Sequence, residues 1–176
     1  RGVTMKRKNV AVIFGGRSGE PVVSLKSARS TMEAIDRERY TIIPVGISRE
    51  GTWLAGDQAW GRLWEQRDLH GVPRAVMLTD PRQPGLLIEE LQGDSSWRFI
   101  GLDLIFPVLH GPYGEDGTVQ GLFELAGIPY VGSGVLSSAV AMDKAIMKIL
   151  FQQHDLPVGP YLYFNRREWQ EDASHW

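Results

Sequence analysis

Val10-Ala11-Val12-Ile13-Phe14, followed directly by Gly15-Gly16-Arg17-Ser18-Gly19-Glu20, is the clearest indication of the fold in this sequence. The first five residues are apolar and partly β-branched, which is typical of a strand buried on both faces of a parallel sheet. Pro21 suits the first turn of a helix, and apolar residues then recur at helical spacing: Leu25, Ala28, Met32 and Ile35. Residues 40–47 are again apolar and β-branched. Strand, helix and strand predict a βαβ unit with a right-handed crossover.

The same alternation returns after residue 101. Residues 102–109 predict a strand that finishes near Pro107, and residues 110–117 form a loop rich in turn formers. We then expect a helix from Val119 to Ala126 with Gly127 after its end, a short strand over 128–131, and one longer amphipathic helix over 136–150. The layout predicts βα units around a parallel sheet, with ligands at the carboxyl ends of the strands. Both glycine-rich loops follow such strand ends.

The segment from Ser48 to Gly101 is less regular, and we interpret it as a decorating insertion. Trp60 and Trp64 lie four residues apart and favour a short helix. Short strands are expected elsewhere in this segment, the first of them antiparallel: residues 51–54, 74–78, 86–91 and 97–100.

Composition narrows the class of protein. The 176 residues carry 19 basic and 21 acidic side chains, a formal net charge of −2. This balance argues against a general binder of nucleic acids or of anionic membranes. The absence of Cys excludes disulfides and thiolate metal sites, and no apolar run approaches the roughly 18–20 residues that span a bilayer. We expect a soluble protein with no export signal.

Glu20 is the residue of the first loop that indicates which kind of ligand could bind there. Gly15–Glu20 matches neither the G-x-G-x-x-G fingerprint nor a P-loop. A carboxylate at a helix N-terminus stays ionised and would repel a phosphate, so a ligand bound here should present a cationic group such as an ammonium. The alternative is that Glu20 only caps the helix.

His110 opens the second loop and could donate to a carboxylate or carbonyl oxygen of a substrate. Glu115 could orient its imidazole, whereas Asp116 stands where a helix N-cap belongs, and we interpret it as structural. The alternative for His110 is a packing role within the loop. For Lys144, beside Asp143 on a predicted helix, the pattern alone favours a solvated surface position.

Four motifs resemble the D-alanine–D-alanine ligase family in order along the chain. The first is Val12-Ile-Phe-Gly-Gly-Arg-Ser-Gly-Glu20 with Val23-Ser24-Leu25. The second, Phe106-Pro-Val-Leu-His-Gly-Pro-Tyr-Gly-Glu-Asp-Gly-Thr-Val-Gln-Gly121, is the longest and most specific. Tyr130-Val-Gly-Ser-Gly-Val and Ala141-Met-Asp-Lys-Ala complete the set.

The resemblance implies a Rossmann-like pre-ATP-grasp domain with a mostly parallel sheet flanked by helices, plus the beginning of an ATP-grasp domain. It implies residues 5–133 as the N-terminal substrate-binding domain and 134–176 as the start of the central domain. Residues 1–4 precede Met5, and we interpret them as a tag or extension. Three such domains need more than roughly 300 residues. We therefore expect an N-terminal portion that is inactive alone, with the metal ligands beyond Trp176.

The resemblance also implies a reaction and its site. ATP, with Mg²⁺ or Mn²⁺, phosphorylates the carboxylate of one D-alanine, and the amine of a second D-alanine displaces phosphate. Glu20 would hold the ammonium of the first D-alanine, and His110 would contact its carboxylate region, which makes these two the catalytic candidates. Val23 and Gly111 would line the same subsite, Ser24 and Glu115 would support it, and Lys144 would reach the ATP phosphates. The family further implies a cytoplasmic homodimer of peptidoglycan precursor synthesis.

Three alternatives stay open, and the first of them follows from a departure from the family pattern. The family commonly has Glu-His-Glu-Val-Ser where this chain has Glu20-Pro21-Val22-Val23-Ser24. A degenerate, non-catalytic binding module is therefore one alternative. A ligase of D-alanine to D-lactate or D-serine is another, and an unrelated doubly wound nucleotide-binding domain, with phosphate at Gly15–Gly19, is a third.

Overall fold

A computed structural model describes residues 6–17, 19–92, 96–171 and 173 of the chain. The expected extension over residues 1–4 and Ser18 of the first loop lie outside the described residues. The chain divides into two compact units, Arg1–Ala139 and Val140–Trp176.

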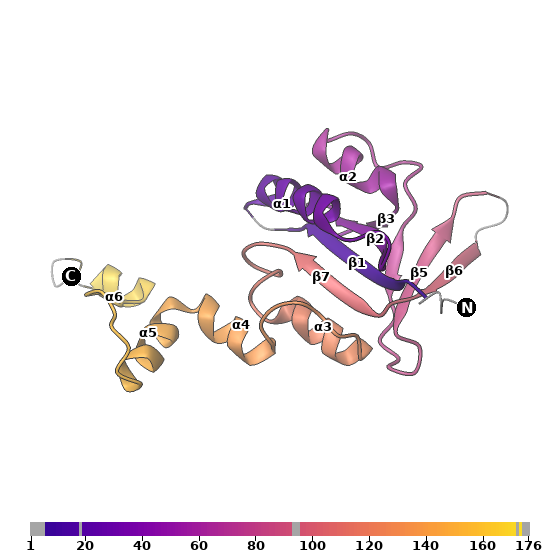
Figure 1. Cartoon of the computed structure of the whole chain (residues 1–176). Helices are drawn as coiled ribbons and strands as arrows, with labels where there is room; N and C mark the ends of the chain where they lie inside the picture. Colours follow the sequence, from indigo (N-terminus) through magenta and orange to yellow (C-terminus); the bar gives the residue numbers. More distant parts are fainter. Residues whose placement is uncertain (1–5, 18, 93–95, 172, 174–176) are drawn as a thin grey trace. The chain divides into compact units, whose positions relative to one another are not determined.

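A four-stranded sheet organises the first unit (Figure 1). β1 (Lys8–Gly15) pairs in parallel with β2 (Tyr40–Ile47) on one side and with β7 (Leu104–Val108) on the other. β3 (Trp53–Ala55) adds an antiparallel edge strand next to β2, so that the order is β3-β2-β1-β7. The mostly parallel sheet expected from the βαβ pattern is confirmed.

β1 is buried on both faces because its alternate residues enter two different core clusters. Val10, Val12 and Phe14 pack with α1 (Pro21–Ala34) and α2 (Asp57–Trp64), which lie on one face of the sheet. Ala11 and Ile13 pack with α3 (Thr118–Ala126) on the other face. A continuous apolar run is therefore what this central position requires.

A second sheet is formed by β4 (Ala75–Met77), β5 (Gly85–Glu90) and β6 (Ser96–Gly101), which pair antiparallel in that order. Leu86 is fully buried and belongs to the same cluster as Ile13 and Phe123. The interpretation of residues 48–101 as decoration is therefore wrong, since this segment completes one side of the core. The predicted helix around Trp60 and Trp64 is confirmed as α2, where the two rings stack 5.3 Å apart.

The strand predicted over residues 128–131 is reduced to one bridge between Tyr130 and Ile105. Ile105 donates to the carbonyl of Pro129 at 2.8 Å and accepts from Val131 at 2.9 Å. Pro129 has no N–H to extend a ladder, which explains why the pairing stops here. Gly127 ends α3 in the left-handed conformation, as predicted.

The single helix predicted over 136–150 is also wrong, because Asp143 divides it into α4 (Val135–Met142) and α5 (Lys144–Gln153). The Asp143 carboxylate accepts hydrogen bonds from the backbone N–H groups of Ala145 at 3.0 Å and Ile146 at 3.1 Å. An Asp side chain that caps the N–H groups ahead of it starts a new helix.

The second unit contains α5 and α6 (Arg166–Glu171). Lys148 lies 4.5 Å over the Tyr161 ring, and Phe164 stacks on Trp169 at 5.3 Å. Across the parts of the chain that the structure describes, no helix combines the length and apolar character needed to cross a membrane.

Candidate functional site

The two glycine-rich loops begin side by side because they follow neighbouring parallel strands. Phe14 of β1 is in register with Val108 of β7, so residues 16–20 and 109–117 leave the sheet at the same edge. This confirms the predicted meeting of the two loops at the carboxyl ends of the strands.

Ser24 joins the bases of the two loops. Its side chain is fully buried in α1, and its hydroxyl accepts from the backbone N–H of Gly15 at 2.7 Å while donating to the carbonyl of Val108. One hydroxyl thus bridges the last residues of β1 and β7. A buried donor and a buried acceptor are satisfied together, which holds the two loop origins in fixed relation.

The first loop begins in close contact with the end of β2. Gly15 and Gly16 have φ values of +87° and +102°, which only glycine adopts readily. A Cβ at Gly15 would overlap the carbonyl oxygen of Ile47, and the N–H of Gly16 donates to that same oxygen at 2.8 Å. The glycines therefore let the backbone pass against β2.

Glu20 and Val23 lie at the exposed start of α1. The N–H groups of Val23 and Ser24 donate to the backbone carbonyl of Glu20 at 3.1 and 3.3 Å. Glu20 occupies the N-cap position of α1, so its role as a ligand-binding carboxylate or as a capping residue stays a prediction. Pro21 begins the helix as predicted.

His110 and Glu115 lie together in the second loop. Glu115 accepts from the N–H of Gly111 at 2.7 Å, and its other carboxylate oxygen is 3.8 Å from Nδ1 of His110. Nε2 of His110 is buried and has no hydrogen-bond partner among the described residues. An unpartnered nitrogen on a ring that is partly open to solvent is suited to a ligand oxygen.

Asp116 has the structural role that the sequence predicted, but the predicted N-cap position is wrong, because Gly117 is the N-cap of α3 and Asp116 precedes it. Its carboxylate accepts from the N–H of Tyr113 at 2.8 Å and from the hydroxyl of Thr118 at 2.6 Å. Partial burial raises the pKa of Asp116, but the hydrogen bonds from Thr118 and Tyr113 outweigh it and bring the pKa below its usual value.

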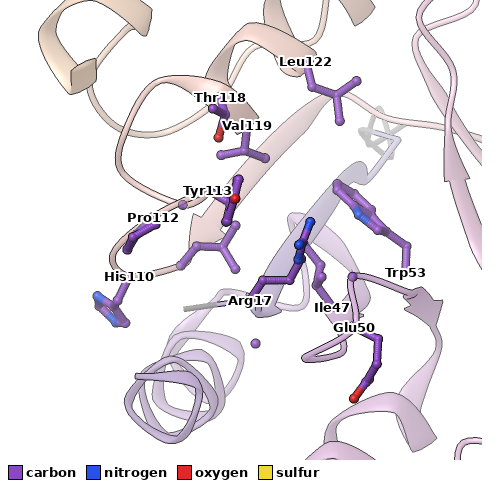
Figure 2. Close-up of a pocket in the computed structure, with 15 residues that line it drawn as sticks. Arg17, Ile47, Glu50, Trp53, His110, Pro112, Tyr113, Thr118, Val119 and Leu122 are labelled. Carbon is purple, nitrogen blue, oxygen red and sulfur yellow. The ribbon is translucent and has the colours of Figure 1, made fainter. Parts of the chain in front are cut away.

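A cavity of about 300 Å³ lies between the loops (Figure 2). In Figure 2, Arg17 and Tyr113 lie close together near its middle, with His110 and Trp53 at opposite ends. Glu50 also lines the cavity, and a hydrogen bond from Ser48 lowers the pKa of its carboxyl. The remaining lining consists of glycines, a proline, a threonine and apolar side chains: Gly15, Gly16, Ile47, Gly51, Leu109, Pro112, Gly114, Thr118, Val119 and Leu122.

The predicted site residues divide between this cavity and its surroundings. His110 lines it, whereas Glu20, Val23 and Gly111 lie outside the lining, in the two loops or the adjoining helix turn. Lys144 belongs to the second unit, where its Nζ donates to the carbonyl of Ala141 at 2.7 Å.

The lining residues that sequence reasoning missed include the charged and aromatic side chains of Arg17, Glu50, Trp53 and Tyr113. Arg17 and Tyr113 stand inside the two motifs, between glycines, so their position was a usable signal. Glu50 and Trp53 come from the β2–β3 connection, where the pattern offered no such signal. In the part of the chain that the structure covers, no group of three or more metal-ligating side chains occurs.

Known proteins share this sequence and fold. A family described as the N-terminus of D-Ala–D-Ala ligases matches residues 9–133. The D-alanine–D-alanine ligase of Heliobacterium modesticaldum is 49% identical over 94% of this chain, and that of Streptomyces coelicolor is 44% identical over 94%. Each alignment covers 44% of the relative, so the chain spans about half the length of the curated relatives it matches.

Solved structures of ligases share the fold of this chain. The VanG D-Ala:D-Ser ligase from Enterococcus faecalis superposes with a TM-score of 0.79 at 38% identity, over 94% of this chain and 47% of its own. The D-alanine–D-alanine ligase from Coxiella burnetii gives 0.76 at 27% identity, over 98% and 50%. An unrelated nucleotide-binding domain is thereby excluded, and the chain belongs to the D-alanine–D-alanine ligase family, of which it carries the N-terminal domain.

Proposed function

We propose that this chain provides the binding site for the first D-alanine in an ATP-dependent D-alanine–D-alanine ligase. The observation that carries the proposal is the pairing of two loops, one ending in Glu20 and the other beginning with His110, at adjacent strand ends joined through Ser24. The Glu20 carboxylate meets the ammonium of D-alanine, and the unpartnered Nε2 of His110 meets its carboxylate.

The roles proposed for Glu20 and His110 follow from the two charges of D-alanine. D-alanine is a zwitterion, so its site needs an anion and a hydrogen-bond donor a few ångströms apart. Val23 and Gly111 flank these two groups, and the carboxylate of Glu115 lies 3.8 Å from the imidazole that it orients. An imidazole held in one orientation stabilises the negative charge that develops when the substrate carboxylate reacts.

ATP would supply the phosphoryl group that activates this carboxylate. In the proposal, Lys144 contacts the phosphates, and the divalent metal that neutralises them is bound by groups outside the described residues, which contain no metal-ligating cluster. Residues 5–133 form the substrate-binding domain, and residues 134–176 begin the ATP-binding one. We further propose a homodimer in the cytoplasm, for which sedimentation velocity would measure the mass.

D-Alanine is also our proposal for the second substrate. The curated relatives at 44–49% identity are D-alanine–D-alanine ligases, which supports this proposal. A degenerate loop remains the competing function, because Pro21 and Val22 replace polar residues of the family pattern.

Titration of the 176-residue chain with D-alanine, followed by NMR, tests the proposal. We expect the resonances of Gly16 and His110 to shift with D-alanine and not with propionate, which lacks the ammonium. Glu20→Gln should weaken binding at least tenfold, since a charge-assisted hydrogen bond contributes about 1.5–3 kcal/mol. Glu33→Gln, a matched change at an exposed position of the same helix, should leave the affinity unaltered.

The same pair of variants can be compared by kinetics. In a chimera, residues 9–133 would replace the matching segment of the Heliobacterium modesticaldum ligase. Glu20→Gln should raise KM for the first D-alanine or lower kcat/KM at least tenfold. Equal kinetics for Glu20→Gln and Glu33→Gln would contradict the role of Glu20 and favour the degenerate loop.

A further inference from the structure

Arg17 and Tyr113 form a contact between the two loops that the proposed function does not use. The guanidinium carbon of Arg17 lies 4.9 Å from the centroid of the Tyr113 ring, which is cation–π distance. Arg17 follows β1 and Tyr113 follows β7, so the contact connects segments almost a hundred residues apart in sequence. Figure 2 shows the two side chains together within the cavity lining.

The backbone of Tyr113 is in the left-handed conformation, which is energetically unfavourable for a residue with a Cβ. Its φ is +65°, and the other two left-handed positions of the loop, at +70° and +92°, are occupied by Gly111 and Gly117. A glycine would fill the position without strain. The Tyr113 N–H donates to Asp116 at 2.8 Å, but any residue with an N–H could do so. The reason for a tyrosine must therefore lie in its ring.

Burial does not supply that reason, because Tyr113 is 52% exposed. The described contact that depends on its ring is the one with Arg17. A strained residue in a binding loop persists where its surroundings require it, and its strain is a pointer to function.

Arg17 is itself held on a second side. A Cβ placed on Gly51 would lie 3.0 Å from Cδ of Arg17, so the side chain runs closely over the connection between β2 and β3. Arg17 thus lies against loops that follow β2 and β7 while belonging to the loop that follows β1. Three neighbouring strand ends are linked through one side chain.

We propose that Arg17 and Tyr113 are positioning residues that hold the His110 loop against the first loop, and so set the affinity of the site for its amino-acid ligand. Residues 110–115 move as a unit in this proposal, because Gly111 accepts from the N–H groups of Gly114 at 3.1 Å and Glu115 at 2.9 Å. The ligand identity rests on the proposed function. The loop-holding role rests on the contact alone.

A double-mutant cycle in the 176-residue chain tests this role. Arg17→Met and Tyr113→Leu should each lower the folding equilibrium constant by some factor. In the double variant the decrease should be about two- to five-fold smaller than the product of those two factors, because both substitutions remove the same contact. Each single variant should shift the imidazole resonances of His110 and weaken D-alanine binding by a similar factor. Tyr113→Phe keeps the ring, and Arg17→Lys keeps a cation. Each of these variants should therefore shift the His110 resonances less than Tyr113→Leu or Arg17→Met does.

Arg39→Met is the matched control. Arg39 lies 5.6 Å over the Tyr40 ring at the opposite end of the strands, so its loss should leave the resonances of His110 in place. Tyr113→Gly is the decisive variant, because it removes both the ring and the strain.

A more stable Tyr113→Gly chain with unshifted His110 resonances would overturn the proposal, and so would fully additive effects of Arg17→Met and Tyr113→Leu. Failure of the wild-type chain to bind D-alanine would count against the proposed function instead. In that case the coupling and the His110 resonances would still decide whether the pair holds the loop.

Discussion

Replacing Ser24 with alanine should destabilise the chain far more than its size suggests. The hydroxyl is fully buried and makes two hydrogen bonds, one from the N–H of Gly15 at 2.7 Å and one to the carbonyl of Val108. In Ser24→Ala, the N–H of Gly15 loses this buried partner, which costs about 1–3 kcal/mol. The lost bond to Val108 adds about 1 kcal/mol, and the higher helix propensity of alanine returns roughly 0.5 kcal/mol.

We therefore expect a net loss of about 1.5–3.5 kcal/mol in the free energy of unfolding, a large part of the roughly 5–15 kcal/mol typical of a domain. Urea unfolding followed by circular dichroism would measure it, with an unchanged m value. Ser30→Ala is the matched control, because Ser30 lies in the same helix, is exposed and gains the same propensity. Its effect should stay within about 0.5 kcal/mol.

The two variants also differ in what they do to the site. Loss of the bridge between β1 and β7 should broaden or shift the amide resonances of Gly16 and His110 in Ser24→Ala, whereas Ser30→Ala should leave them in place. Ser24→Cys, which nearly keeps the volume but bonds weakly, should fall between the two. If Ser24→Ala and Ser30→Ala unfold at the same urea concentration, the hydroxyl does not hold the strand ends together and our reasoning is refuted.

Three further changes test the loops. Asp116→Asn should make the free energy of unfolding depend less steeply on pH in the acid range. The pKa of Asp116 is lowered in the folded chain, so its ionised carboxylate contributes stability above about pH 4. This stability is lost as pH falls through the folded pKa. Urea titrations at several acidic pH values would measure the slope, and equal slopes would contradict the role. Gly15→Ala should cost at least about 2 kcal/mol, because φ is +87° and the new Cβ would meet the Ile47 carbonyl. Gly19→Ala, with no atom within 4 Å of its Cβ, is the control in thermal melts. His110→Ala should weaken D-alanine binding at least tenfold while changing stability by less than about 1 kcal/mol, and a reversed order of these effects would return His110 to a packing role.

The elements with a strong local pattern were predictable. The apolar run of β1 and the helical spacing of α1 identified a βαβ unit, because burial of a strand on both faces requires a continuous apolar run and burial of one helix stripe leaves a helical period. The left-handed glycine at Gly127 was equally predictable, since this conformation after a helix restricts the residue type. The motif around His110 identified the family as well as the loop.

Other features of the fold depend on contacts between distant residues, which leave no periodic pattern in the sequence. Whether residues 48–101 decorate or complete the core depends on Leu86 reaching the cluster of Ile13, which is a matter of distance in space. The division of the long helix depended on one side chain, Asp143, whose capping bonds compete with continued helix.

The parallel sheet and the two glycine-rich loops could be read from the amino-acid sequence, whereas the ligand-binding roles of Glu20 and His110 stay predictions. How the loops are joined, through the buried hydroxyl of Ser24 and the ring of Tyr113 under Arg17, could be seen only in the folded chain. The reason is physical: a periodic pattern records which face of an element is buried, whereas a hydrogen bond or ring contact between distant segments exists only once folding has brought both partners to the same place.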